Sequence, residues 1–139
     1  MAKTYNPAQV AVVFNGHEVS GYADGSFVTV ARDEDGWGLS VGSSGEGVRS
    51  KMNNKSGTIT VTLIQSSESN TFLSGFAELD ELSGGGQGPL LVKDNSGSSL
   101  HVCESAWIQK VADAEYAREA GSREWVFRTD NLVSHVGDN

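Results

Sequence analysis

The sequence predicts a mainly β fold, an antiparallel β-sandwich or barrel with one packed α-helix. Seventeen glycines against two prolines in 139 residues indicate many turns that join short elements. Several short runs are rich in β-branched residues, and one alternates strictly between apolar and threonine side chains. One further segment has helical spacing of its apolar residues. Because no linker interrupts the chain, residues 1–139 are expected to form a single domain.

The first strands are predicted near the N-terminus. Residues 10–14 form an apolar run that ends at Asn15-Gly16, a pair that favours a two-residue hairpin turn because both residues tolerate positive φ. The chain is then expected to return through residues 17–19. A β-branched run at residues 27–32 predicts the next strand.

A long stretch rich in Gly, Ser and Asp follows at residues 33–56 and contains one short apolar piece, Trp37–Val41. Loops of this length are uncommon inside a compact domain and are usually functional or disordered. We interpret the stretch as a long hairpin or an excursion loop that is partly mobile.

The clearest strand pattern lies at residues 57–65, where side chains alternate between an apolar face and a hydroxyl face. The apolar face consists of Ile59, Val61 and Leu63. The hydroxyl face consists of Thr58, Thr60 and Thr62. This period of two predicts a sheet with one face toward the core.

The predicted helix follows this strand, with Ser69 or Asn70 as the residue that caps its first turn. Apolar residues then recur at three- and four-residue spacing and are expected to face the sheet. They are Phe72, Leu73, Phe76, Leu79 and Leu82. The helix is expected to stop at residues 83–86, where three glycines follow a serine.

The C-terminal third predicts further strands at residues 90–93 and 100–111. Residues 113–120 fit either a helix or an excursion loop. Two short strands close the chain, at residues 125–128 and 132–136.

No catalytic, cofactor-binding or metal-binding residue stands out, and the protein is not expected to be an enzyme. The single cysteine, Cys103, excludes an intramolecular disulfide and is expected to be a small buried hydrophobe. None of the three histidines has metal-ligand spacing to another His, Cys or carboxylate. The serines at residues 43 and 44 lack the G-x-S-x-G context of a nucleophile elbow.

The formal net charge of −8 disfavours a protein that grips nucleic acid through its phosphates, because that function needs clustered Lys and Arg. Neither a signal peptide nor a transmembrane segment is predicted. A soluble protein made in a reducing cytoplasm is therefore expected.

A set of segments in residues 21–70 carries a resemblance to a known family. It begins with Gly21-Tyr22-Ala23-Asp24-Gly25-Ser26-Phe27 and continues through Arg32-Asp33-Glu34-Asp35, Trp37 and a glycine-rich stretch to Arg49. It ends with the segment from Ser56 to Asn70. In this order and spacing they resemble phage structural proteins, a family that includes the tail tube proteins of contractile-tailed bacteriophages. From Leu90 onward the match lies in the strand pattern.

The resemblance implies a virion structural protein, a β-barrel-like subunit with one flanking helix similar to type VI secretion tube proteins. Such subunits form hexameric rings that stack into a hollow tube inside a contractile sheath. The implied partners are further copies of the chain, the tail sheath protein, the tail terminator and baseplate hub proteins. DNA is expected to pass through the lumen without specific binding, since an acidic wall repels phosphate. The implied location is the phage tail, assembled in the host cytoplasm.

Two surfaces are expected to take part in assembly. The stretch at residues 33–56 is the candidate for ring-to-ring contact, because interface energy concentrates in large side chains. Its candidate residues are Trp37, Val41, Arg49 and Met52. The hydroxyl face of Thr58, Thr60 and Thr62 is expected to belong to a continuous inter-subunit sheet, so bulky apolar substitutions there should perturb ring assembly.

The sequence is also compatible with other classes of protein. A tube of a secretion system or tailocin that carries no genome fits the same features. A β-sandwich module that binds carbohydrate or another ligand suits the glycine-rich loops and three tryptophans. A small hydrolase is the third alternative.

Overall fold

The computed structural model describes residues 2–139 as ten strands and one α-helix, with a short 3₁₀ helix at Pro7–Gln9. The helix α1 spans Ser69–Ser83. The strands are β1 (Val10–Phe14), β2 (His17–Glu18), β3 (Val28–Arg32), β4 (Trp37–Val41), β5 (Gly47–Lys51), β6 (Gly57–Ile64), β7 (Gly88–Asp94), β8 (Leu100–Lys110), β9 (Ser122–Thr129) and β10 (Leu132–His135).

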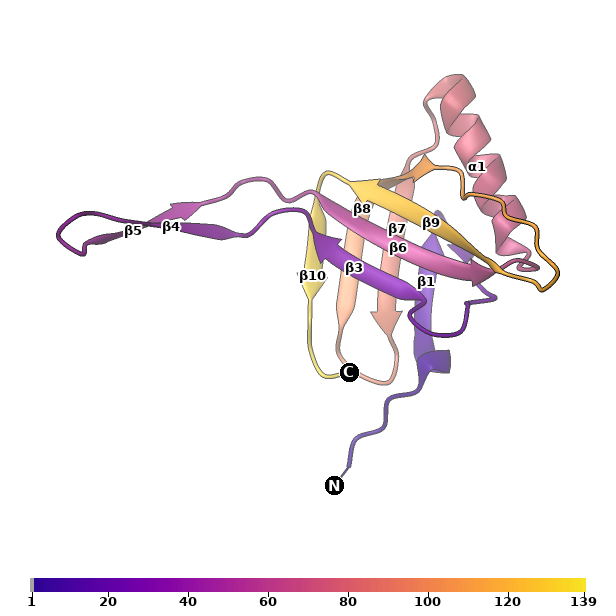
Figure 1. Ribbon diagram of the computed structural model, residues 1–139, viewed down its shortest axis with the longest axis horizontal. Helices are drawn as coiled ribbons and strands as arrows, with labels where there is room; N and C mark the ends of the chain where they lie inside the picture. The colour runs from indigo at the N-terminus through magenta and orange to yellow at the C-terminus, as the bar shows by residue number, and fades with distance from the viewer. Residues whose placement is uncertain (1) are drawn as a thin grey trace.

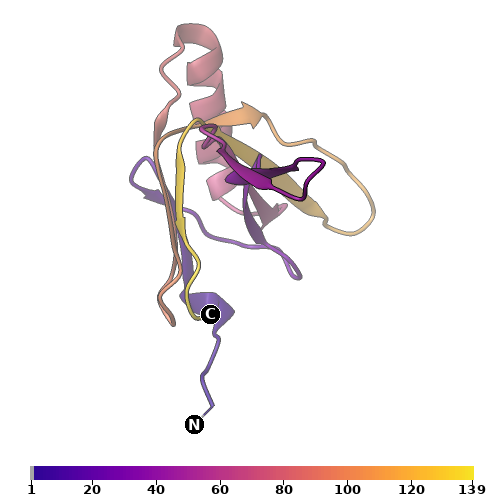
Figure 2. The same cartoon turned by 90° about the vertical axis from the view of Figure 1, so that its left-hand side faces the viewer.

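The main sheet is antiparallel and has the order β2-β1-β7-β8-β9-β6-β3. The long strand β8 belongs to two layers. Its first residues pair with β10 and its last residues, from Ala106 onward, pair with β9. The two layers cross steeply, one formed by β1, β7, β8 and β10 and the other by β9, β6 and β3 (Figures 1 and 2). The predicted antiparallel sandwich with one helix is confirmed.

The core lies between these layers and continues beneath α1. The apolar face predicted for β6 is fully buried, and Cys103 is buried as expected. Burial raises the pKa of the Cys103 thiol, as expected for a structural cysteine. The ring of Phe14 lies 5.0 Å from that of Phe127 and 4.9 Å from that of Phe76 on the helix. These aromatic contacts join both layers and α1 into one core.

Two expectations about the helix are wrong. Ser69 and Asn70 lie inside α1 and do not cap it; the Ser67 hydroxyl instead accepts a bond from the Ser69 N–H at 3.2 Å. The Ser69 hydroxyl accepts from the Ser20 N–H, and Asn70 accepts from the indole N–H of Trp125 at 2.9 Å. Both side chains therefore fix the helix to the rest of the fold.

The apolar stripe of α1 is also shorter than predicted. Leu73 is buried, but Leu79 and Leu82 are 48% and 88% exposed. The last turns of α1 rise beyond the ends of the strands, so no sheet lies beneath them (Figure 1). The helix ends at Gly84 in the left-handed conformation, with a φ of 70°.

Two open alternatives are decided by the structure. Residues 33–56 contain a hairpin, because β4 and β5 pair as a separate two-stranded sheet. Residues 113–120 form no helix and belong to an irregular excursion between β8 and β9. The ends of this excursion are held by an ion pair between Lys110 and Asp113 at 3.2 Å and by a bond from Gly121 N–H to the Gln65 side chain.

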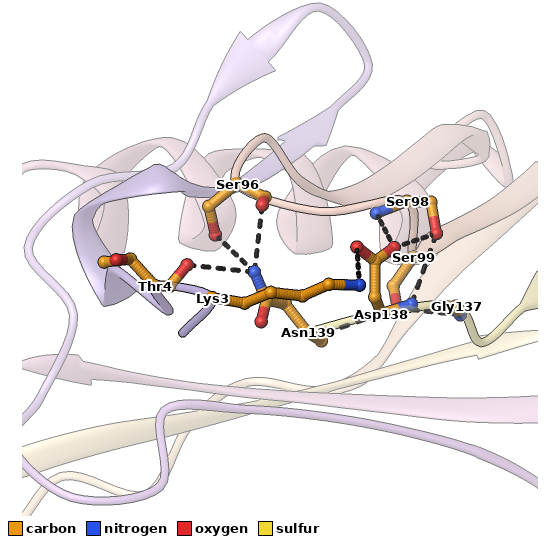
Figure 3. A network of polar contacts seen from close by, with 8 residues as sticks. All are labelled: Lys3, Thr4, Ser96, Ser98, Ser99, Gly137, Asp138 and Asn139. Atoms are coloured by element: carbon orange, nitrogen blue, oxygen red, sulfur yellow. Dashed lines mark hydrogen bonds and ion pairs between the residues drawn. The ribbon is translucent and has the colours of Figure 1, made fainter. Parts of the chain in front are cut away.

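The C-terminal residues bond to the turn between β7 and β8, and residues near the N-terminus bond to them in turn (Figure 3). The Asn139 side chain donates to the carbonyls of Thr4 and Ser96, at 3.1 and 2.9 Å. The Asp138 carboxylate accepts from Ser98 and pairs with Lys3 at 3.4 Å. The hydrogen bonds from Ser98, with a smaller contribution from Lys3, lower the pKa of Asp138. This network closes one end of the sandwich.

Candidate assembly surfaces

The β4–β5 hairpin projects away from the two layers (Figure 1). Its register pairs Trp37 with Lys51, Leu39 with Arg49 and Val41 with Gly47. Directly opposed residues of an antiparallel pair share one face. Three large apolar side chains and two cations therefore lie on the same face, which we call the hairpin face. It consists of Trp37, Leu39, Val41, Arg49 and Lys51.

This face is exposed along its whole length, and Leu39 at its centre is 73% exposed. The Arg49 guanidinium lies 4.0 Å from the centre of the Trp37 ring, a cation–π contact that holds both side chains in place. A run of exposed large apolar residues on a projecting element is typical of an interaction surface.

Of the four residues predicted for ring-to-ring contact, three lie on the hairpin face. They are Trp37, Val41 and Arg49. Met52 lies on the opposite face, over Gly38, where a Cβ on the glycine would meet the Met52 Cε at 2.9 Å. Leu39 is not among the predicted residues, although the alternation along the strand from Trp37 to Val41 places it on the same face as both.

The base of the hairpin is fixed by Asp33, which directly follows β3. Its carboxylate accepts hydrogen bonds from Ser56, Thr58 and Arg128, each at 2.8 Å. The backbone N–H of Asp33 also donates to the Ser56 carbonyl at 3.1 Å. Asp33 thus joins the strand that enters the hairpin to the strand that leaves it and to β9. The hydrogen bonds from Thr58 and Ser56, followed by the charge of Arg128, lower the pKa of Asp33.

Replacing Asp33 with Asn is expected to lower the melting temperature modestly at neutral pH, because the ion pair and the charge-assisted bonds are lost. A carboxyl whose pKa is lowered by folding stabilises the fold at pH values above its ordinary pKa, near 3.8. This stabilisation is lost as the pH falls through the lowered pKa of the folded state. The difference between wild type and Asp33→Asn should therefore shrink on acidification below about pH 4. Thermal unfolding between pH 7 and pH 3 measures it, and a difference independent of pH would contradict this interpretation.

The outer edge of β3 is open. Phe27 O accepts from Thr62 N–H and Asp33 N–H donates to Ser56 O, so these residues direct their backbone groups toward β6. By alternation, Val28 and Val30 direct their N–H and C=O groups away from the sheet. Such an edge can pair with a strand of another chain.

Two other edges are partly covered by the chain itself. On β10, the Leu132 N–H donates to the Lys55 carbonyl at 2.8 Å, and its carbonyl accepts from the Arg32 side chain at 2.7 Å. On β1, beyond the short β2, the Val12 N–H donates to the Tyr22 hydroxyl at 3.2 Å. These bonds make both edges less able to accept another strand than that of β3.

The hydroxyl face of β6 is half-buried and lies in the body, where Thr58 at one end of it bonds to Asp33 at the base of the hairpin. It is continued by Thr29 on β3, opposite Thr60, and by Val126 and Glu124 on β9. Because β6 pairs with β3 and β9 along both edges, the threonines can meet another subunit through their side chains and not through a free backbone edge. Their place in an inter-subunit sheet stays a prediction.

Within residues 2–139, no group of three or more His, Cys, Asp or Glu side chains is arranged to hold a metal ion. Across the same residues, α1 falls short of the length and apolar character that a membrane-spanning helix requires.

The fold is similar to those of chains from contractile injection systems. A chain of the extended sheath–tube complex of the extracellular contractile injection system PVC superposes with a TM-score of 0.64 at 10% identity, over 95% of this chain and 91% of the other. The sheath/tube terminator of PVC gives a TM-score of 0.60 at 8% identity, over 97% and 99%. The tube-terminating cap of the anti-feeding prophage gives 0.60 at 8% identity, over 97% and 93%. The fold class is that of contractile-system tube and terminator proteins.

Similarity in sequence identifies the family to which the chain belongs. The model of the bacteriophage PhiTE tail tube protein family matches residues 8–137. Structural protein ORF10 of Pseudomonas phage KPP10 is 33% identical over 144 residues, which cover 98% of this chain and 83% of that protein. The chain belongs to the PhiTE tail tube protein family and is a structural tail tube protein of a phage or phage-like contractile system.

Proposed function

We propose that this protein forms hexameric rings that stack into the DNA-conducting tube inside a contractile sheath. The observation that carries the proposal is the projecting hairpin, whose large apolar side chains remain exposed in the single subunit. An exposed apolar face on an element that extends away from the core is unfavourable in water and favours burial against another chain.

Ring closure requires two different surfaces of each subunit to meet in a head-to-tail manner. The open edge of β3 is the candidate for one of them, because the free backbone groups of Val28 and Val30 are satisfied when another strand pairs with them. The hydroxyl face of β6 lies beside this edge in the same layer and supplies side chains for a wall that continues from subunit to subunit.

Contact between rings is assigned to the hairpin. Its length lets it reach beyond the body of its own subunit (Figure 1), and Asp33 fixes its direction at the base. A direction that is already fixed reduces the conformational entropy lost on assembly.

A tube inside a contractile tail has three further partners: the sheath protein around it, the terminator at one end and the baseplate hub at the other. The tube is assembled in the host cytoplasm and is part of the virion. The chain has a formal net charge of −8, so a stacked tube repels DNA phosphate and lets the genome slide. No enzymatic activity is proposed. A tailocin or secretion tube has the same architecture. Whether the neighbouring genes encode a phage genome-packaging system distinguishes a phage tube from these.

Electron microscopy of the purified protein tests the proposal. Rings of six subunits or hollow filaments are expected at high concentration, and mass photometry should show hexamers or their multiples. A correctly folded sample that stays monomeric at every concentration would contradict it and would favour the ligand-binding module.

A further inference from the structure

The sandwich has an open cavity of about 430 Å³ between its layers, bordered by the free edge of β3. Its apolar walls come from both layers and from the segment after β10. They include Phe27 and the five valines Val10, Val28, Val30, Val92 and Val136. Val28 and Val30 also carry the outward backbone groups of the β3 edge, so the cavity and a strand-pairing site lie side by side.

One buried charge lines this cavity. Asp94, at the end of β7, is 7% exposed. Its Oδ1 accepts from the N–H and the hydroxyl of Ser96, at 2.9 and 2.6 Å. Its Oδ2 is buried and has no hydrogen-bond partner among residues 2–139. A buried carboxylate oxygen without a donor is unfavourable, so the cavity is suited to a group that brings a donor or a positive charge.

The one imidazole that lines the cavity, that of His101, does not supply that charge. His101 bonds through Nδ1 to the Ser134 hydroxyl at 2.8 Å. Burial lowers the pKa of His101, which favours the neutral imidazole at neutral pH. A complementary occupant therefore needs apolar side chains for the valines and a cation for Asp94.

The hairpin face has this combination. It carries exposed apolar side chains beside Arg49 and Lys51, and Arg49 is already held in place over Trp37. Within β4, β5 and the turn between them, residues 37–51, the chain has two cations, Arg49 and Lys51, against the single carboxylate of Glu46, although the whole chain is acidic. The hairpin thus differs in charge from the body that it would contact.

We propose that the cavity of one subunit receives the hairpin face of a second copy, with Leu39 against the valines and Arg49 toward Asp94. The inference rests on the proposed self-assembly and names the receptor for the hairpin. A guanidinium suits this position because it is more weakly hydrated than an ammonium and forms several directed bonds with a carboxylate.

Mixed-chain cysteine cross-linking tests the contact. Val136 borders the cavity, is 80% exposed and is therefore replaceable without disturbing the core. Chains with Val136→Cys are mixed with tagged chains carrying Leu39→Cys, assembled and oxidised. The native Cys103 is buried and serves as the unreactive background. The matched control replaces the exposed Leu82 of α1 with Cys in place of Val136.

The expected result is a disulfide-linked heterodimer from Val136→Cys and Leu39→Cys that is several-fold more abundant than with the Leu82→Cys control. Tubes that form normally but give no excess over the control would overturn the docking site while leaving the proposed function intact. A wild-type chain that forms neither rings nor tubes would overturn both.

A charge placed on either side of β4 gives a second test. Leu39→Asp puts a carboxylate on the hairpin face, whereas Ser40→Asp puts it on the opposite face of the same strand. The concentration needed for assembly should rise at least about tenfold for Leu39→Asp, because a carboxylate in place of Leu39 enters the apolar cavity and competes with Asp94 for Arg49, which lies opposite it. Ser40→Asp should stay close to wild type. Equal effects of the two substitutions would overturn the assignment of the face.

Discussion

Deletion of residues 42–47 is expected to leave a folded subunit that no longer stacks into tubes. These residues form the tip of the hairpin, where Gly42 N–H donates to Glu46 O and Gly45 has a φ of 84°. Their removal joins Val41 directly to Val48, so these two valines must take part in a new turn. The hairpin face then loses its outer end.

The subunit itself should tolerate this deletion. The hairpin forms a two-stranded sheet separate from the main sheet, and none of its residues belongs to the buried core. The melting temperature should therefore change little, while negative-stain images show rings or single subunits in place of long tubes. Gly45→Asn is the matched control, because asparagine tolerates positive φ and keeps the length of the tip. Normal tubes from the deleted chain would refute the role of the tip in stacking.

The features that the sequence predicts well are those with a local cause. The alternation at residues 57–65 identifies both the strand β6 and its buried face, because successive side chains of a strand point to opposite faces. The consecutive glycines predict where α1 ends. By contrast, the exposure of Leu79 and Leu82 depends on where the sheet ends in space. The spacing of apolar residues along a helix gives no information about that position.

The candidate assembly surfaces also combine features that local sequence patterns predict with features that they do not. Trp37, Val41 and Arg49 lie on one hairpin face, which follows from the strand period once the register is known. The register and the role of Asp33 depend on contacts between distant residues, since Asp33 and Arg128 are separated by 95 positions. The cavity needs both layers in place, so no local pattern indicates that Asp94 lies beside the valines of β3.

Replacing Phe127 with Ala is expected to have the largest effect on stability. Phe127 lies fully buried on β9, between Ile59 of β6 and Ile108 of β8, and its ring contacts that of Phe14. Truncating a buried Phe typically costs about 3–5 kcal/mol, because the apolar burial is lost and a cavity remains. Small domains have total stabilities of only about 5–15 kcal/mol. The melting temperature should fall by roughly 10–20 °C for a chain of this size.

Leu82→Ala is the matched control for Phe127→Ala, because an exposed leucine beyond the end of the sheet should change the stability by less than about 0.5 kcal/mol. Chemical unfolding of both variants measures the difference, and equal midpoints would contradict the core described here.

Phe127→Ala should lose folded subunits while retaining every hairpin residue, whereas deletion of residues 42–47 should lose stacking while retaining every core residue. Because each folded subunit is less stable, tubes formed by Phe127→Ala should dissociate at a lower temperature than tubes of the wild type, although binding between folded copies stabilises both by mass action.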